Sequence, residues 1–154
     1  MARIGITSSL SRNSARPILV LLSRDTQLGK AVKRAAGKEW IVWSRVFDEL
    51  ASLIREPNVR LVVFDDQSVS ALDRGWALAE IRRYFSRASI VYIAAQHDSE
   101  IEREARVRGV LFYTSKPLRP ADASLLLKGV LRMHKGNPHS RIGPANIAMV
   151  KSQK

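Results

Sequence analysis

The sequence contains no cysteine, and its eight glycines are scattered over 154 residues. The absence of cysteine excludes a disulfide framework, a thiolate metal site and a cysteine nucleophile. The scattered glycines form neither a P-loop nor a G-x-G-x-x-G phosphate-binding turn. None of the three histidines stands with an acid and a serine in the arrangement of a hydrolase. These absences remove the commonest nucleotide-binding and hydrolytic classes.

Long apolar runs are absent too, and none approaches the roughly 18 to 20 residues that a membrane-spanning helix needs. The first residues, "MARIGITSSLSRNSARP", lack the apolar stretch of a secretory signal. We therefore expect a protein of the bacterial cytoplasm that is not inserted in a membrane.

Acidic residues are scarce, because 14 aspartates and glutamates face 26 lysines and arginines, for a net charge of +12. Residues 1–16 and 134–154 are basic and contain no acid. Their composition predicts two disordered tails around one domain at residues 17–133. Such tails either stay solvated and bind nothing, or attract nucleic acid without sequence specificity.

Short apolar runs alternate with helical patterns along the domain. The runs predict five strands, at 18–22, 40–43, 60–65, 89–95 and 110–114. Between and after them, helical spacing predicts helices at 26–37, 47–56, 75–85, 99–109 and 120–134, the first capped by Thr26 and ended by Gly37. This alternation predicts an α/β fold, a doubly wound parallel sheet with helices on both faces. In such a sheet, functional groups lie at the carboxyl ends of the strands.

Two of these strand ends carry polar groups. "RLVVFDDQ" ends an apolar strand in Asp65 and Asp66, and "YTSKPL" places Lys116 directly after the last strand. A carboxylate at a strand end can stay hydrated, bind a metal or act as a nucleophile; alternatively, Asp66 or Ser68 simply caps the next turn. If the ends of the third and fifth strands lie side by side, Lys116 can reach Asp65.

The domain resembles a response-regulator receiver domain of the CheY-like kind. Asp65, at the end of "LVVFD", matches the phospho-acceptor, and Lys116 matches the phosphate-sensing lysine. Pro117 matches a proline usually preceded by a cis peptide bond, and Tyr113 matches the aromatic switch position. The resemblance implies a flavodoxin/CheY-like sheet in the order 2-1-3-4-5. It also implies phosphoryl transfer to Asp65 from a histidine kinase or a small phosphodonor, with Mg²⁺ bound.

The metal ligands depart from the pattern of that family. Ser23 and Arg24 fill the positions of its acidic pair, and Asp25 is the nearest carboxylate. The family's third ligand is a backbone carbonyl, here that of Gln67. A serine and an arginine do not replace two carboxylates around Mg²⁺. We therefore expect a weak or absent Mg²⁺ site made by Asp25, Asp65 and the Gln67 carbonyl.

The switch residue of the family is also missing, because Ala94 stands where a threonine or serine hydroxyl would bind the phosphoryl group. Two roles then remain open for Asp65. It forms a plain ion pair with Lys116 that holds the loop, or it still accepts a phosphoryl group.

These departures favour a receiver-like signalling module that is not an enzyme and that acts through protein contacts. Its expected partners are another signalling protein, a histidine kinase or a second copy, joined through the charged helix at 99–109 or a surface around Trp76. Two alternatives remain: a conventional phospho-accepting single-domain regulator, and an accessory protein that binds nucleic acid through its basic tails.

Overall fold

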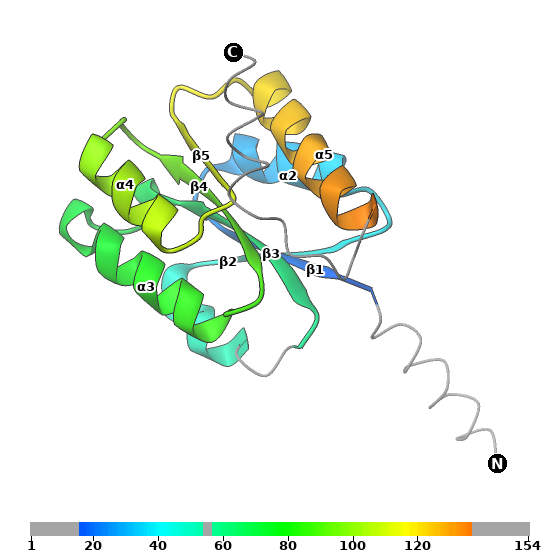
Figure 1. The fold of residues 1–154 in the computed structure, drawn as a ribbon. Helices are drawn as coiled ribbons and strands as arrows, with labels where there is room; N and C mark the ends of the chain where they lie inside the picture. Colours follow the sequence, from blue (N-terminus) through cyan, green and yellow to red (C-terminus); the bar gives the residue numbers. More distant parts are fainter. Residues whose placement is uncertain (1–15, 54–56, 137–154) are drawn as a thin grey trace.

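The computed structural model describes residues 16–53 and 57–136. Five strands form one parallel sheet in the order β2-β1-β3-β4-β5 (Figure 1). They are β1 (Ile18–Leu22), β2 (Ile41–Arg45), β3 (Val59–Asp65), β4 (Ser89–Ala94) and β5 (Phe112–Ser115). The predicted fold class and strand order are confirmed.

Helices cover both faces of the sheet (Figure 1). On one face lie α2 (Thr26–Ala36) and α5 (Pro120–Gly136). On the other lie the 3-10 helix η1 (Phe47–Leu53), α3 (Arg74–Tyr84) and α4 (Ser99–Val107). Two short 3-10 turns, η2 (Asp66–Ser68) and η3 (Ala71–Asp73), connect β3 to α3.

The central strands are buried on both faces, which is why they read as continuous apolar runs rather than alternating ones. All five residues of β1 are buried, and so is every residue of β3 except Arg60. Alternate residues of β3 enter two separate cores. Val62 and Phe64 pack toward α3 and α4, whereas Leu61 and Val63 pack toward α2 and α5.

Several predicted boundaries are wrong. The cap of α2 is Asp25 and not Thr26, because the Asp25 carboxylate accepts the backbone N–H groups of Gln27 and Leu28. The second strand starts at Ile41, since Trp40 is buried and meets the ring of His134 instead. The fifth strand starts at Phe112, and the N–H of Val110 closes the end of α4 on the Ala105 carbonyl.

The helix expected at 47–56 is a 3-10 helix over Phe47–Leu53, and residues 54–56 lie outside the described part. Gly37 does end α2, with a φ of 61° that favours glycine. The two predicted basic tails lie outside the described residues, apart from Arg16 and the end of α5. Among the described residues, no helix is both long and apolar enough to cross a membrane.

Candidate functional site

Asp65 ends β3 with its side chain almost wholly buried, at 2 % exposure. Its Oδ2 atom accepts a hydrogen bond from Ser23 Oγ at 2.7 Å and another from Lys116 Nζ at 2.9 Å. Its Oδ1 atom accepts the backbone N–H of Gln67 at 3.1 Å, so Asp65 caps the turn η2. Both carboxylate oxygens are therefore already hydrogen-bonded within the protein.

Lys116 reaches Asp65 across the end of β4. Its backbone N–H donates to the Ala94 carbonyl at 2.8 Å, and the Lys116–Pro117 peptide bond is cis. Its ammonium group also contacts Gln67 Oε1 at 2.8 Å and Asp25 Oδ2 at 3.5 Å. The structure thus brings Asp65 and Lys116 together, although 51 positions separate them in the sequence.

An open cavity of about 400 Å³ lies over this ion pair. The lining residues are Arg24, Asp25, Asp65, Gln67, Ser68 and Lys116. Two cations therefore balance two carboxylates in one small space.

Asp66 lies in a separate network, centred on a buried carboxylate, that the sequence did not reveal. At 2 % exposure, it accepts the Tyr92 hydroxyl at 2.8 Å and the backbone N–H of Ala95 at 2.7 Å. The guanidinium group of Arg74 approaches its Oδ2 atom at 3.6 Å. Burial and the neighbouring Asp66 carboxylate raise the pKa of Tyr92 far above its ordinary value, so Tyr92 remains a hydrogen-bond donor.

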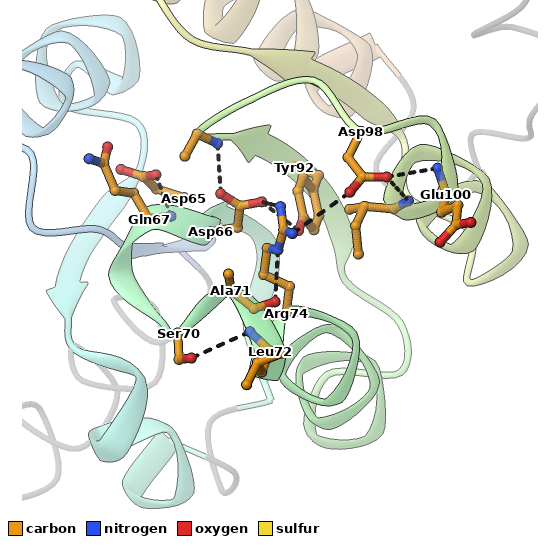
Figure 2. Close-up of polar contacts among 12 residues, drawn as sticks. Asp65, Asp66, Gln67, Ser70, Ala71, Leu72, Arg74, Tyr92, Asp98 and Glu100 are labelled. Atoms are coloured by element: carbon orange, nitrogen blue, oxygen red, sulfur yellow. Dashed lines mark hydrogen bonds and ion pairs between the residues drawn. The ribbon is translucent and has the colours of Figure 1, made fainter.

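Arg74 connects this network to α4 (Figure 2). It lies between Asp66 and Asp98, whose Oδ2 atom is 3.7 Å from the guanidinium group. Asp98 caps α4 by accepting the backbone N–H groups of Glu100 and Ile101. The predicted alternative that Asp66 caps the turn is wrong, because Asp65 provides the cap. The signal available in the sequence was Tyr92, a hydroxyl in the middle of an apolar strand.

No family model and no curated protein sequence matches the chain. Solved structures do match it. A response regulator from Thermotoga maritima shares 25 % identity at a TM-score of 0.59, covering 75 % of this chain and 95 % of its own. The phosphorylated cyanobacterial phytochrome response regulator RcpA shares 15 % identity at a TM-score of 0.64, and the match covers 84 % of this chain and 99 % of RcpA. The orphan response regulator HP1043 of H. pylori shares 18 % identity at a TM-score of 0.62, and the match covers 77 % of this chain and 96 % of HP1043.

The chain has the receiver fold. The matches span 95 to 99 % of the length of these response regulators. The resemblance inferred from "LVVFD" and "YTSKPL" is therefore confirmed for the fold. Sequence identities of 15 to 25 % support a shared fold but not shared roles for individual side chains. The roles of the site residues are therefore argued from the geometry of this chain.

The metal position of the receiver fold is poorly provided with ligands in this chain. The Oδ1 atom of Asp25 caps α2, and its Oδ2 atom faces Lys116. Lys116 occupies the space between the Asp25 and Asp65 carboxylates, and Arg24 lines the same cavity. Among the described residues, no group of three or more acidic, histidine or cysteine side chains could hold a metal ion. These residues fit a lysine ammonium rather than Mg²⁺.

The two predicted switch residues, Ala94 and Tyr113, lie in β4 and β5. Ala94 ends β4 and is fully buried, so no hydroxyl faces the cavity from that position. Tyr113 is turned inward and stacks on Tyr92 with ring centroids 5.4 Å apart. Burial raises the pKa of Tyr113, whose hydroxyl lies 3.3 Å from the backbone nitrogen of Asp98. The aromatic pair therefore packs against the same loop that Arg74 holds.

Proposed function

We propose that this protein is a receiver-like signalling module whose acceptor site is closed by an ion pair and which acts through protein contacts. The observation that carries the proposal is the saturation of Asp65. Its two oxygens accept three hydrogen bonds, and one of the donors is the Lys116 ammonium at 2.9 Å. Nucleophilic attack on a phosphoryl group needs one of these oxygens to be freed in a nearly buried position.

The substituted residues around Asp65 support this proposal. Phosphoryl transfer depends on neutralising the charge of the transferring group, usually with a metal ion. Here Ser23 and Arg24 stand in place of two carboxylates, and the remaining Asp25 is already bonded to the start of α2. The loss of ligands at such a site typically costs 10-fold or more in metal affinity.

An exposed apolar surface close to the site supports the protein contacts. Leu72 is 96 % exposed and Trp76 is 59 % exposed, on the turn η3 and the first turn of α3. The Trp76 ring packs on Phe47 with centroids 5.4 Å apart, so it is held outward by a neighbour rather than inserted in the core. Exposed tryptophan is enriched at protein interfaces.

The charged helix α4 gives less support to a symmetric dimer. Arg106 pairs with Glu102 and Arg108 pairs with Glu104, one turn apart within the same helix. In a symmetric dimer joined through α4, these four side chains would have formed ion pairs with the second copy instead. We therefore assign the partner contact to the Leu72–Trp76 surface before α4.

The test is incubation with a small phosphodonor and Mg²⁺, followed by intact-protein mass spectrometry. We expect no added phosphoryl group on the native chain. We also expect slow phosphorylation of Ser23→Asp/Arg24→Asp/Ala94→Thr, which returns the missing carboxylates and the hydroxyl. The matched control adds Asp65→Asn to that variant and should remove the modification.

Phosphorylation of the native chain that Asp65→Asn abolishes would establish the conventional regulator instead. Light scattering before and after the reaction would then show whether the oligomeric state follows the modification.

A further inference from the structure

The edge of the sheet opposite Asp65, where the strands begin, carries an exposed cation in or shortly before every strand. We call this set the basic edge; it consists of Arg16, Lys38, Arg60, Arg87 and Arg108. Arg108 also pairs with Glu104 of α4 at 3.4 Å, and Glu39 is an exposed acid beside Lys38. Because neighbouring strands lie about 4.8 Å apart, five strands spread these charges over about 20 Å.

Side-chain hydrogen bonds join neighbouring strand starts at both ends of this edge. The Arg16 guanidinium group donates to the Lys38 carbonyl at 2.7 Å, which joins the starts of β1 and β2. The Arg82 guanidinium group donates to the carbonyls of Ala88, Arg108 and Gly109, which joins the starts of β4 and β5. The bond from Arg16 uses the carbonyl of Lys38 and not its ammonium group.

The helix dipoles explain part of this charge but not all of it. Cations in the last turn of a helix are stabilising, and α2, α3 and α4 each carry them there. Lys38 and Arg87 follow the C-caps of α2 and α3, Gly37 and Phe85, so the helix dipoles account for part of their placement. Arg16 precedes β1 and Arg60 lies in β3, away from any helix terminus.

The opposite edge of the sheet carries charges of both signs. The carboxylates of Asp25, Asp65 and Asp98 cap helices or turns there, and Asp66 is buried beside them. Lys116 and Arg74 pair with these carboxylates, and Arg24 lines the same cavity as Asp25 and Asp65. The excess of positive charge that attracts a polyanion therefore lies at the basic edge.

Both ends of the domain also lie at the basic edge. Arg16 precedes β1, and His134 in the last turn of α5 meets Trp40, which directly precedes β2, with ring centroids 5.7 Å apart. From these points the sequence continues into residues 1–15 and 137–154, which contain basic residues and no acid.

We propose that the basic edge binds the phosphate backbone of a nucleic acid without sequence specificity. Four of its five residues are arginines, whose planar guanidinium groups suit phosphate oxygens. A lipid surface would also take apolar side chains, as amphipathic membrane-binding segments do. Among the large exposed apolar side chains of the described residues, only Val107 lies next to this edge. The proposal does not depend on the state of Asp65.

The test measures binding of the full chain to a labelled mixed-sequence DNA duplex by fluorescence anisotropy, between about 50 and 200 mM salt. The edge variant removes three cations: Lys38→Gln, Arg60→Gln and Arg87→Gln. The matched control variant removes three cations elsewhere: Lys30→Gln, Arg45→Gln and Arg119→Gln. Both variants carry the same net charge. We expect the edge variant to bind about 10-fold more weakly at the lower salt concentration and to lower the log–log salt slope by about 2 to 3.

The single variants Lys38→Gln and Arg87→Gln should each lower the slope by about 0.9, which keeps the test valid if the triple variant is unstable. Equal losses in the edge and control variants would overturn the proposal in favour of net charge alone. The proposal would also be overturned if DNA affinity fell only in a third full-length variant, in which Arg3, Arg12, Arg141, Lys151 and Lys154 are replaced by glutamine, and not in the edge variant. Binding to anionic phospholipid vesicles without binding to the duplex would also overturn it.

Discussion

Asp65 and Asp66 are consecutive residues at the end of one strand, and both are almost wholly buried, yet their surroundings differ in kind. The donors around Asp65 are adjustable, because a serine hydroxyl can rotate and the Lys116 ammonium has alternative acceptors on Gln67 and Asp25. The donors around Asp66 are the Ala95 backbone, the enclosed Tyr92 hydroxyl and the Arg74 guanidinium group. One carboxylate borders a cavity, and the other belongs to the framework.

This difference separates Asp65, which belongs to the candidate site, from Asp66, which belongs to the surrounding framework. A group that must react or exchange partners needs neighbours that can move, whereas a buried structural charge needs neighbours that are fixed and complete. Asp66 also reaches α4 through Arg74 and Asp98 (Figure 2). The end of β3 thus combines an adjustable ion pair with a fixed connection to the neighbouring helix.

The largest expected effect comes from replacing each carboxylate with its amide. Asp66→Asn should lower the free energy of unfolding by about 3 kcal/mol, because the amide NH₂ must face a donor whichever way it turns and Arg74 loses its buried partner. The free energies are obtained from urea unfolding followed by circular dichroism.

The matched variant Asp65→Asn should cost less than about 1 kcal/mol, since Ser23 can rotate to accept a hydrogen bond and Lys116 can turn to Asp25. If the two variants lost equal stability, the distinction between the two carboxylates would be wrong.

A smaller effect is expected from removing one hydroxyl of the fixed network. Tyr92→Phe should lower the free energy of unfolding by about 1.5 kcal/mol, because Asp66 then loses its only side-chain hydroxyl donor in a buried position. Combined with Asp66→Asn, it should cost less than the sum of the two single changes, which a double-mutant cycle measures.

Tyr113→Phe is the control, because the Tyr113 hydroxyl makes only longer contacts of 3.3 and 3.4 Å with Asp98. A loss from Tyr113→Phe that matched the loss from Tyr92→Phe would assign the stability to the aromatic stack rather than to the Asp66 network.

The smallest expected effect is the contribution of His134 to the free energy of unfolding at low pH. It must be known before the stabilities of the Asp65 and Asp66 variants are compared at different pH values. Burial, with a contribution from the charge of Arg60, lowers the pKa of His134 from its ordinary value of 6.5. The unfolded chain therefore binds a proton more readily than the folded chain. Stability from this group is present above pH 6.5 and declines as the pH falls toward the folded value.

Because His134 is partly accessible, we expect its contribution to stay below about 1 kcal/mol. His134→Phe should remove it and keep the contact with Trp40, as judged from urea unfolding at several pH values. His97→Gln serves as the control and should leave the acid-side decline in place. A decline that persisted in His134→Phe would assign it to the carboxylates.

The sequence predicted the parts of this protein that depend on local pattern. The runs at "ILVLL" and "RLVVFD" are continuous and apolar because these strands are covered on both faces, so both were found almost to the residue. Asp65 and Lys116 were also found, since polar residues directly after buried strands lie at the functional edge of a parallel sheet. The boundaries failed where a tertiary contact intervened, as at Trp40, which packs on His134.

What the sequence by itself determined is the order and type of the elements, because burial on one or two faces leaves a period that can be read along the chain. Tertiary structure alone decided which polar groups meet. The pairing of Asp66 with Tyr92 and the alignment of cations along the basic edge depend on strand register and crossover direction. These join residues that are distant in sequence and leave no period in it.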